Sequence, residues 1–372
     1  MSEFPSRTIV HMDLDSFYVS VECIRDSSLI GKAIIIGMDS VRGVVASCSY
    51  EARMFGVHSA MPSKQAKQLC PHAVFIPPDM EKYSEYSALV RKVIEDRAPL
   101  FEQASIDEFY LDISGMDKFF GCYKWTTGLR ETIIKETGLP ISFGMSSNKM
   151  ISKIATNESK PNGQRQILPG TEKEFLAPLS VGTMPGIGAK TEEALRRINL
   201  LTLGDLARMK SEVMEEAFGN GGRSLWERAN GIDDTPVYPD AERKSISTEH
   251  TFTDDTRDEK FLKRLIIKMV EELSFSIRKE EKLTGCVTIK IKYADFEVKT
   301  MQRSISYSSS DQILFKHATE LFDELYSRRK AIRLMGVRFS NFVRGSRQID
   351  LFEDTTQTIK LYQAMDKIRF KF

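Results

Sequence analysis

The chain has 372 residues, of which 41% are hydrophobic and 28% charged, and its formal net charge is +1. At roughly 150 residues per domain, this length and composition predict two to four compact units with packed cores. No run approaches the roughly 20 apolar residues that cross a membrane, and the N-terminal residues lack a signal-peptide core, so we expect a cytoplasmic protein. The cysteines and histidines are dispersed, which is typical of reduced thiols and argues against a zinc site.

Residues 7–169 predict a mixed α/β region. Residues 7–15 alternate as a short buried strand, with His11, Asp13 and Asp15 on one side. The other predicted strands are 33–37, 44–49, two runs within 101–114, and 139–145. The predicted helices are 16–26, 50–56, 61–70, 84–100, 122–138 and 146–160. Apart from a small unit inserted after the first strand, this is the order of a split βαβ sheet.

The second half of the chain changes character twice. Residues 170–235 predict short helices with Gly-rich turns, and the Pro-containing segment that follows predicts an exposed linker. Beyond it a new β-α-β-β-α-β order is predicted, with strands at 245–252, 285–293, 298–306 and 332–343 and helices at 261–280 and 312–328. Residues 243–345 contain 21 Lys or Arg against 15 Asp or Glu. This excess fits a phosphate-binding module, although ordinary surface variation explains it equally well.

Three carboxylates stand where predicted strands end. Asp13 lies near the end of the first strand, and Asp107 and Glu108 lie where two strand-like runs meet. Neighbouring strands of a split βαβ sheet would bring them together, and carboxylates packed together are tolerated when metal ions neutralise them. Two magnesium ions held in this way suit phosphoryl transfer. Acids at strand ends are more often turn formers, so this pattern alone is a weak signal. Asp15 shares the face of Asp13 and is expected to support the site without binding metal.

Five motifs in one order and spacing carry a much more specific signal. HMDLDSFYVSVE, VVASCSYEAR, SIDEFYLDIS, GMSSNKMISKIA and SKPNG resemble the Y-family translesion DNA polymerases, of the bacterial DNA polymerase IV type, over nearly the whole chain. The resemblance implies a multidomain α+β right hand, with a split-βαβ palm, small fingers, a helix-hairpin-helix thumb and a β-α-β-β-α-β little finger. The expected boundaries are palm 1–22 and 80–169, fingers 23–79, thumb 170–235, linker 236–243, little finger 244–345 and tail 346–372.

The resemblance also implies roles around the metal ions. Asp13, Asp107 and Glu108 would be the catalytic ligands of two Mg²⁺, and the backbone carbonyl of Leu14 would contact the nucleotide-side ion. Asp13 and Asp107 would bridge both ions, and Glu108 would serve the primer-side ion alone. Tyr18 stands at the family's steric gate, where its ring would exclude a ribose hydroxyl. It also suits a core aromatic of the first helix, and both roles can hold.

Further matches concern the nucleotide. Arg53, Tyr50, Ser47 and Lys160 correspond to the residues that bind the triphosphate, and Arg53 offers paired donors for it. Small side chains at Val44, Val45 and Ala46 would roof the nascent base pair. A loose roof discriminates shapes poorly, which predicts lesion tolerance and low fidelity.

Two regions are candidates for holding DNA. The MPGIGAK turn, through Gly186, Gly188 and Lys190, resembles a helix-hairpin-helix whose amides approach a phosphate, although a tight turn alone also explains it. In the C-terminal unit, period two places basic residues on strand faces, and the candidates are Lys290, Lys292, Lys299, Arg303, Arg333 and Arg338. Arg333 and Arg338 cannot share a face unless a bulge lies between them. A basic sheet face would bind DNA without reading sequence, and a merely soluble face is the alternative.

The tail contains Gln348, Leu351 and Phe352, which resemble a bacterial sliding-clamp-binding peptide. The prediction is therefore a monomeric, template-directed, low-fidelity DNA polymerase that extends a primer with dNTPs in translesion synthesis, without proofreading. Its partners would be primer-template DNA, dNTPs and the sliding clamp. We expect no association with a membrane. The main alternative is a catalytically silent DNA-binding scaffold recruited by the clamp. A nucleotide cyclase is a third reading, but it would need neither the helix-hairpin-helix nor the clamp peptide.

Overall fold

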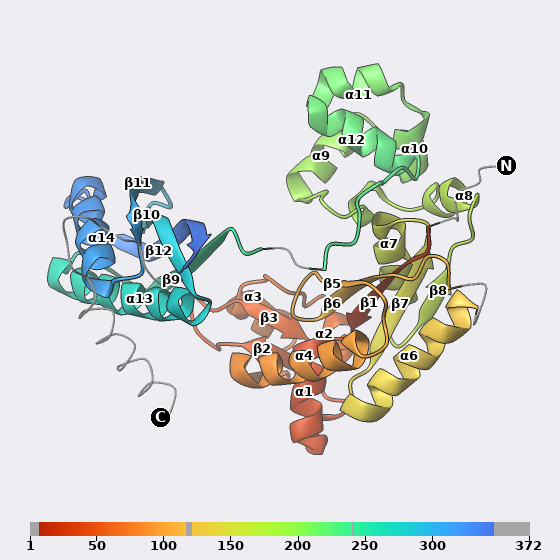
Figure 1. Cartoon of the computed structure of the whole chain (residues 1–372), viewed down its shortest axis with the longest axis horizontal. Helices are drawn as coiled ribbons and strands as arrows, with labels where there is room; N and C mark the ends of the chain where they lie inside the picture. The colour runs from red at the N-terminus through yellow and green to blue at the C-terminus, as the bar shows by residue number, and fades with distance from the viewer. Residues whose placement is uncertain (1–6, 117–120, 240–241, 346–372) are drawn as a thin grey trace. The chain divides into compact units, whose positions relative to one another are not determined.

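The computed structural model describes residues 7–116, 121–239 and 242–345. The chain divides into two compact units, Met1–Ala241 and Glu242–Phe372 (Figure 1). The division falls within the predicted linker, whereas the boundaries of palm, fingers and thumb inside the first unit remain predictions. The predicted clamp peptide, with Gln348, Leu351 and Phe352, lies outside the described residues. Among the described helices, none is long and apolar enough to cross a membrane.

A five-stranded sheet of order β5-β6-β1-β7-β8 forms the centre of the first unit. Its strands are β1 (Ile9–Leu14), β5 (Phe101–Gln103), β6 (Glu108–Asp112), β7 (Ile141–Ser146) and β8 (Gln164–Gln166). β1 lies between β6 and β7 and is antiparallel to both. This arrangement confirms the predicted split βαβ order and explains why all six residues of β1 are buried.

The two faces of this sheet are covered differently. Val10, Met12 and Leu14 face a core shared with α1 (Phe17–Arg25), α4 (Met80–Glu95) and α6 (Cys122–Thr137). The opposite face is covered in part by α7 (Lys149–Ser159), which packs against β7 and β1. Gly144 on β7 allows this close approach, because a Cβ there would lie 2.2 Å from the Ser152 carbonyl oxygen. Asp13, the acidic residue of β1, therefore points toward the side of the sheet that α7 covers.

A smaller sheet of order β3-β2-β4 follows α1 in sequence. It contains β2 (Ile34–Gly37), β3 (Val45–Cys48) and β4 (Val74–Ile76), and it packs with α2 (Tyr50–Arg53) and α3 (Ser63–Leu69) around its own apolar cluster. A short 3₁₀ turn, η1 (Ser27–Leu29), connects α1 to this unit.

A helical part follows β8 and has a further apolar core, which it shares with one face of α7. Its elements are α8 (Glu172–Leu176), η2 (Val181–Thr183), α9 (Ala189–Arg197), α10 (Leu203–Arg208), α11 (Ser211–Phe218) and α12 (Asn220–Ala229). The segment after α12 is predicted to be an exposed linker, and its described residues 235–239 are exposed except for Val237. Val237 is 5% exposed and packs with Ile9 and Tyr110. An apolar side chain in a polar stretch is thus buried against the palm sheet.

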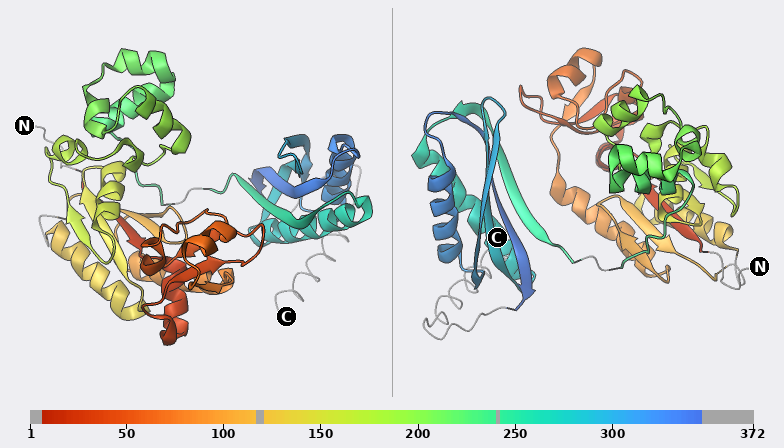
Figure 2. Two further views of the ribbon diagram at one scale, coloured as in Figure 1. Left: turned by 180° about the vertical axis from the view of Figure 1, so that it is seen from behind. Right: turned by 90° about the horizontal axis from the view of Figure 1, so that it is seen from above.

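The second unit is an antiparallel sheet of order β11-β10-β12-β9. Its strands are β9 (Ser245–Thr256), β10 (Lys282–Tyr293), β11 (Val298–Ser308) and β12 (Ile332–Arg344). The helices α13 (Glu259–Lys279) and α14 (Asp311–Leu325) cover one face of this sheet, and the other face carries no helix among the described residues (Figures 1 and 2). This is the predicted β-α-β-β-α-β arrangement.

Candidate active site

Asp13 and Glu108 face each other where β1 ends and β6 begins. The two residues are direct cross-strand partners in the antiparallel register. Directly opposite carboxylates repel, and Asp13 is only 6% exposed. Burial, only partly offset by Lys160, raises the pKa of Asp13 to about 7. The site therefore holds a carboxylate that the fold ionises at a free-energy cost, as expected where a cation binds.

Two lysines of the α7 segment supply positive charge to these carboxylates. Lys160 Nζ lies 2.5 Å from Asp13 Oδ1. Lys153 Nζ lies 2.7 and 2.6 Å from the two carboxylate oxygens of Glu108. Burial acts to raise the pKa of Glu108, but the Lys153 ammonium at both of its oxygens lowers it, and the net value is about 2. At neutral pH, Glu108 is therefore ionised, whereas Asp13 is close to the midpoint of its titration.

His11 completes the cluster, although the sequence did not single it out. It lies on the same face of β1 as Asp13 and is fully buried. Burial lowers its pKa to about 4, so the imidazole is neutral. One ligand atom from each of His11, Asp13 and Glu108 lies within 4.8 Å of the other two, and among the described residues this is the single His, Cys, Asp and Glu cluster of this kind.

Asp107 is close to this cluster without belonging to it. Its backbone carbonyl accepts a hydrogen bond from the Leu14 amide at 3.1 Å, which ties the strand ends together. Its carboxylate instead accepts a 2.5 Å hydrogen bond from the Ser105 hydroxyl. The structure therefore unites two of the three predicted acids, and the third is turned toward its own loop.

Asp15 has the supporting place that its position on the strand face predicted. Its buried carboxylate accepts hydrogen bonds from Ser142 Oγ at 2.9 and 3.0 Å and from the Asn162 amide at 2.7 Å. These bonds hold the turn that follows Lys160. Gly163 in this turn cannot be larger, because a Cβ there would lie 1.8 Å from the Ser159 carbonyl oxygen.

Tyr18 has the surroundings of a core aromatic, and its role as a steric gate stays a prediction. Its ring is half-buried at the edge of the palm core and stacks on Tyr83 at 4.3 Å between centroids, with 12° between the planes. Burial and then the nearby charge of Asp107 raise its pKa. The ring thus packs as a core aromatic while it lies near an active-site acid.

The predicted triphosphate residues lie on β3 and α2. Arg53 is exposed, and its guanidinium lies 4.9 Å from the centre of the Tyr50 ring. The Tyr50 hydroxyl is buried without a hydrogen-bond partner, and burial raises its pKa to about 12. Ser47 is half-buried. A buried hydroxyl of this kind is a group that a ligand oxygen can satisfy.

The predicted roof of three residues needs a correction. Val44 and Ala46 are exposed, but Val45 is 1% exposed and belongs to the core of the small sheet. Successive side chains of a strand point to opposite faces, so Val45 cannot share a surface with its two neighbours.

The helix-hairpin-helix candidate forms the predicted turn before α9. Gly186 has φ +88°, a left-handed conformation that favours glycine, and Gly188 is the N-cap residue of α9. Lys190 in the first turn of α9 is exposed. The Arg228 guanidinium donates a 2.6 Å hydrogen bond to the Pro185 carbonyl and so holds the turn from α12.

The basic residues of the second unit lie on opposite faces of its sheet, which corrects the predicted patch. Lys290 and Lys292 point away from the helices, and Arg338 joins them because it pairs with Thr288 on the same face. Arg303 is the partner of Val287, whose side chain belongs to the helix-side core, and its guanidinium contacts Glu320 and Glu324 of α14 at 2.5 Å.

Lys299 likewise pairs with Ile291 on the helix side. Arg333 lies at a bulge in β12, and both its guanidinium and the Lys292 ammonium lie 4.7 Å from the Phe296 ring centre. The bulge therefore lets Arg333 approach the open face, whereas Lys299 and Arg303 are excluded from it.

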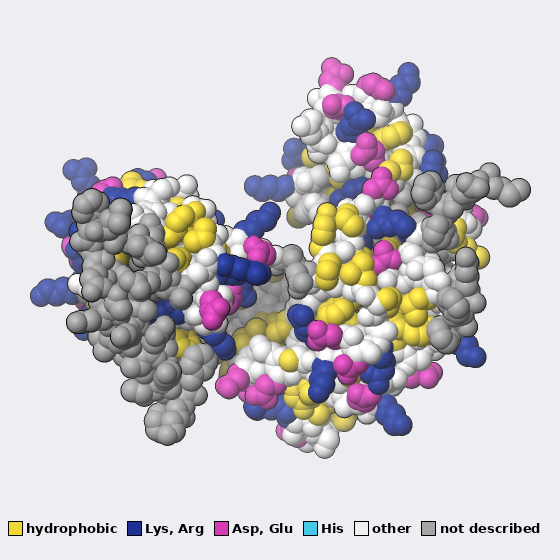
Figure 3. All heavy atoms as spheres, viewed as in Figure 1, with side chains coloured by type: hydrophobic (Ala, Val, Ile, Leu, Met, Phe, Trp, Pro, Cys, Tyr) yellow, Lys and Arg dark blue, Asp and Glu magenta, His cyan; other side chains and the backbone are white. Residues whose placement is uncertain are grey.

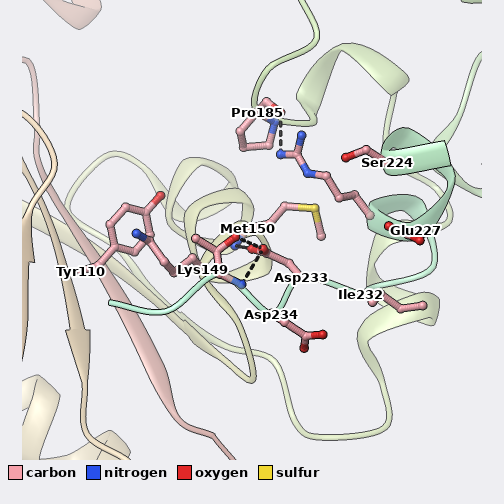
Figure 4. Close-up of a pocket in the computed structure, with 11 residues that line it drawn as sticks. Tyr110, Lys149, Met150, Pro185, Ser224, Glu227, Ile232, Asp233 and Asp234 are labelled. Carbon is pink, nitrogen blue, oxygen red and sulfur yellow. Dashed lines mark hydrogen bonds between the residues drawn. The ribbon is translucent and has the colours of Figure 1, made fainter. Parts of the chain in front are cut away.

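A cavity of about 580 Å³ lies in the first unit, between the sheet, α7 and the helical part (Figure 4). Tyr110 and Lys149 line it from the palm, Pro185 and Arg228 from the helical part, and Asp233 from the segment after α12. The Met150 amide donates a 3.0 Å hydrogen bond to Asp233. Charged groups of both signs line this cavity and are interspersed over the face of the first unit in Figure 3.

Comparison with known proteins settles the family. The impB/mucB/samB family matches residues 12–157, its C-terminal domain matches 243–351, and the HHH motif of the same family matches 169–200. The DNA polymerase IV of Dehalococcoides mccartyi strain BAV1 is 39% identical over 370 residues, covering 98% of this chain and 95% of that protein. The chain belongs to the Y family of DNA polymerases, as a DNA polymerase IV.

Other relatives agree with this assignment. The DNA polymerase IV of Streptococcus pneumoniae serotype 2 is 36% identical over 345 residues, covering 91% of this chain and 97% of that protein. DinB from Sulfolobus solfataricus matches with 26% identity and a TM-score of 0.63, covering 91% of this chain and all of that one. A Dbh–Dpo4 polymerase chimera matches in fold with a TM-score of 0.80 and 24% identity. The chain is therefore a DNA-directed DNA polymerase of the translesion type, and its family uses divalent metal ions.

Two site residues of this Y-family polymerase escaped sequence reasoning. Lys153 resembles an ordinary helix charge in the sequence, although its i, i+4 spacing places it on the same side of α7 as Lys149. His11 was set aside because the histidines are dispersed in sequence. The signal that identifies it is its period-two relation to Asp13 on a strand.

Proposed function

We propose that this polymerase extends primers with dNTPs on damaged templates at low fidelity and without proofreading, using two magnesium ions. The observation that carries the proposal is the pair of facing carboxylates, Asp13 and Glu108, with lysine ammonium groups at both. Opposed acids at a strand edge are costly in a purely structural role. They suit a site that receives cations together with a phosphate-bearing substrate.

The donor atoms fit magnesium. Asp13, Asp107 and Glu108 offer carboxylate oxygens, the ligands that Mg²⁺ prefers, and the Leu14 carbonyl lies beside them in sequence. Asp107 joins this set once its carboxylate leaves the Ser105 hydroxyl. Bound magnesium ions would activate the primer hydroxyl and steady the leaving triphosphate. In the proposed division, Asp13 and Asp107 would help to hold both ions, and Glu108 would help to hold the primer-side ion.

The remaining residues bind and orient the nucleotide. The Lys160 side chain is expected to leave Asp13 and to bind the triphosphate. Metal ions at Asp13 would supply the positive charge that Lys160 supplies in their absence. Arg53, Tyr50 and Ser47 would bind the phosphates from the opposite side, and phosphate oxygens would satisfy the free Tyr50 hydroxyl.

Tyr18 is proposed to exclude the ribose 2′-hydroxyl, since its ring is fixed by stacking on Tyr83. Val44 and Ala46, which are exposed, remain candidates for the roof over the base pair. A roof without bulky groups would accept distorted template bases and would explain low fidelity.

Duplex DNA would be held by backbone contacts. The proposed contacts are the Gly186–Gly188 turn with Lys190, and the open sheet face with Lys290, Lys292, Arg333 and Arg338.

The tail is proposed to bind the sliding clamp. A double change of Leu351→Ala with Phe352→Ala should abolish binding to an immobilised clamp and leave extension without the clamp intact. Retained clamp binding would refute the peptide assignment.

Primer extension with magnesium and dNTPs tests the catalytic assignment. Asp107→Ala should reduce extension at least ~10³-fold relative to wild type, because it removes a metal ligand. Asp39→Ala, which removes an exposed carboxylate paired with Lys67, is the matched control and should extend normally. Equal extension by wild type and Asp107→Ala, or none by wild type, would sink the assignment and favour the silent scaffold.

A further inference from the structure

We propose that His11 is a nitrogen ligand that makes this metal site selective for manganese-like transition ions over magnesium. The site would consist of His11 Nε2 with one carboxylate oxygen each from Asp13 and Glu108. The inference goes beyond the proposed function, because it concerns ion binding in the absence of DNA and nucleotide. It therefore survives or fails independently of the catalytic roles.

The first observation is an unpartnered nitrogen. His11 is fully buried, and its Nε2 makes no hydrogen bond. Glu108 Oε2 lies 3.7 Å from this nitrogen, which is too long for a hydrogen bond. A buried ring nitrogen left in this way is costly unless a ligand completes it.

The second observation concerns the proton on the other ring nitrogen. His11 Nδ1 lies 2.9 Å from Thr156 Oγ1. The Thr156 hydroxyl also lies 2.8 Å from the Ser152 carbonyl and 3.0 Å from the His11 carbonyl, and both of these oxygens only accept. The single hydroxyl proton is therefore used on a carbonyl, and the hydroxyl oxygen accepts from Nδ1–H.

This tautomer leaves a lone pair on Nε2, directed toward a carboxylate oxygen. The lone pairs of His11 Nε2 and Glu108 Oε2, which lie 3.7 Å apart, repel each other. A cation between the two atoms removes this repulsion because both atoms can bind it as ligands. A histidine whose second nitrogen donates to a neighbouring group is the usual arrangement in metal sites. Thr156 has that neighbouring role here.

The spacing suits one ion. Ligand atoms each about 2.1 Å from an ion can be at most about 4.2 Å apart. The 3.7 Å separation of Nε2 and Oε2 meets this limit, and the 4.8 Å bound on the whole cluster requires closure by only a fraction of an ångström. The cations of Lys153 and Lys160 show that positive charge is accepted at both oxygens.

The donor set determines which ion is favoured. Mg²⁺ binds oxygen ligands and strongly retains water, so the imidazole adds little to its affinity. Fe²⁺, Ni²⁺ and Zn²⁺ accept imidazole nitrogen readily, and Mn²⁺, at the weak end of the same affinity order, gains less from it than they do but more than Mg²⁺. The structure therefore predicts that His11 raises affinity for Mn²⁺ and leaves affinity for Mg²⁺ nearly unchanged.

Pulsed electron paramagnetic resonance on the full chain with Mn²⁺ alone tests this inference. The wild type should show ¹⁴N coupling from an imidazole bound to manganese. His11→Asn keeps a donor for Thr156 but removes the Nε2 position, so the coupling should disappear and Mn²⁺ affinity should fall about 10- to 100-fold. His11→Gln places an amide at the Nε2 position and should recover part of the affinity without imidazole coupling.

Mg²⁺ affinity, measured by competition with Mn²⁺, should change less than about threefold in both variants. Thr156→Val, which removes the hydroxyl that fixes the tautomer, is a second probe that keeps the imidazole, and it should weaken Mn²⁺ binding. Imidazole coupling that persists in His11→Asn, or is absent in wild type, would overturn the proposal. An equal loss of Mg²⁺ and Mn²⁺ affinity would overturn the selectivity.

Discussion

Neutralising Asp13 is expected to stabilise the metal-free polymerase while it abolishes catalysis. In the native state the pKa of Asp13 is about 7, against an ordinary value of 3.8. The folded protein therefore binds more protons than the unfolded chain between these two values. Stability falls as pH rises through this window, and the cost of ionising Asp13 is fully present above pH 7.

The magnitude follows from that shift. A change of about three pKa units corresponds to about 4 kcal/mol at 1.36 kcal/mol per unit. Asp13→Asn removes this cost but leaves Lys160 without its partner, which offsets about 1 to 2 kcal/mol. We therefore expect Asp13→Asn to be more stable than wild type by about 2 to 3 kcal/mol at pH 8, and by much less at pH 5.

Urea unfolding followed by tryptophan fluorescence, in the presence of a chelator, measures this difference. Both tryptophans, Trp125 and Trp226, lie in the first unit, so the signal reports on the unit that contains Asp13. Asp39→Asn, at an exposed ion pair, should change the free energy of unfolding by less than about 1 kcal/mol at either pH. The reasoning fails if Asp13→Asn is no more stable than wild type at pH 8, or if its advantage does not grow from pH 5 to pH 8.

Three further outcomes test other parts of the site. Asp15→Asn should destabilise the first unit by about 1.5 to 3 kcal/mol, because it weakens the hydrogen bonds that hold the turn after Lys160. The same change should raise the KM for dNTP more than it lowers kcat. An unchanged KM in steady-state extension would contradict this. Arg338→Ala should weaken duplex binding and reduce the salt slope by about 1, whereas Arg303→Ala, on the helix side, should leave the slope unchanged when anisotropy is measured across salt concentrations. Tyr18→Ala should raise the ratio of ribonucleotide to deoxynucleotide incorporation, and a ratio equal to that of wild type would refute the gate role.

The catalytic edge was predictable because local rules determine it. Alternation in β1 and the split βαβ order were enough to bring Asp13 beside the β6 strand. The side-chain state of Asp107 was not predictable, because its bond to Ser105 depends on the loop conformation. The same alternation rule, applied to residues 44–46, separates Val45 from the face of Val44 and Ala46, and the structure shows that Val45 is the buried one.

The basic patch shows where such rules stop. Period two correctly places Lys299 and Arg303 on one face of their strand, but it does not give the register between strands. That register pairs Arg303 with Val287 and so turns it toward α14. Pairing registers depend on turns and bulges, as in β12, where Arg333 departs from the regular alternation.

Helix α7 links the stability of the site to its chemistry. It carries Lys153, and Lys160 caps its end, so the groups that neutralise Glu108 and Asp13 come from one rigid element. Close packing at Gly144 fixes this element against the sheet, and Asp15 fixes the turn beyond it. Under the proposed function, metal ions held by Asp13 and Glu108 would compete with these ammonium groups. Lys160 would then be available to the triphosphate, and this would couple metal binding to nucleotide binding through one helix and its C-cap residue.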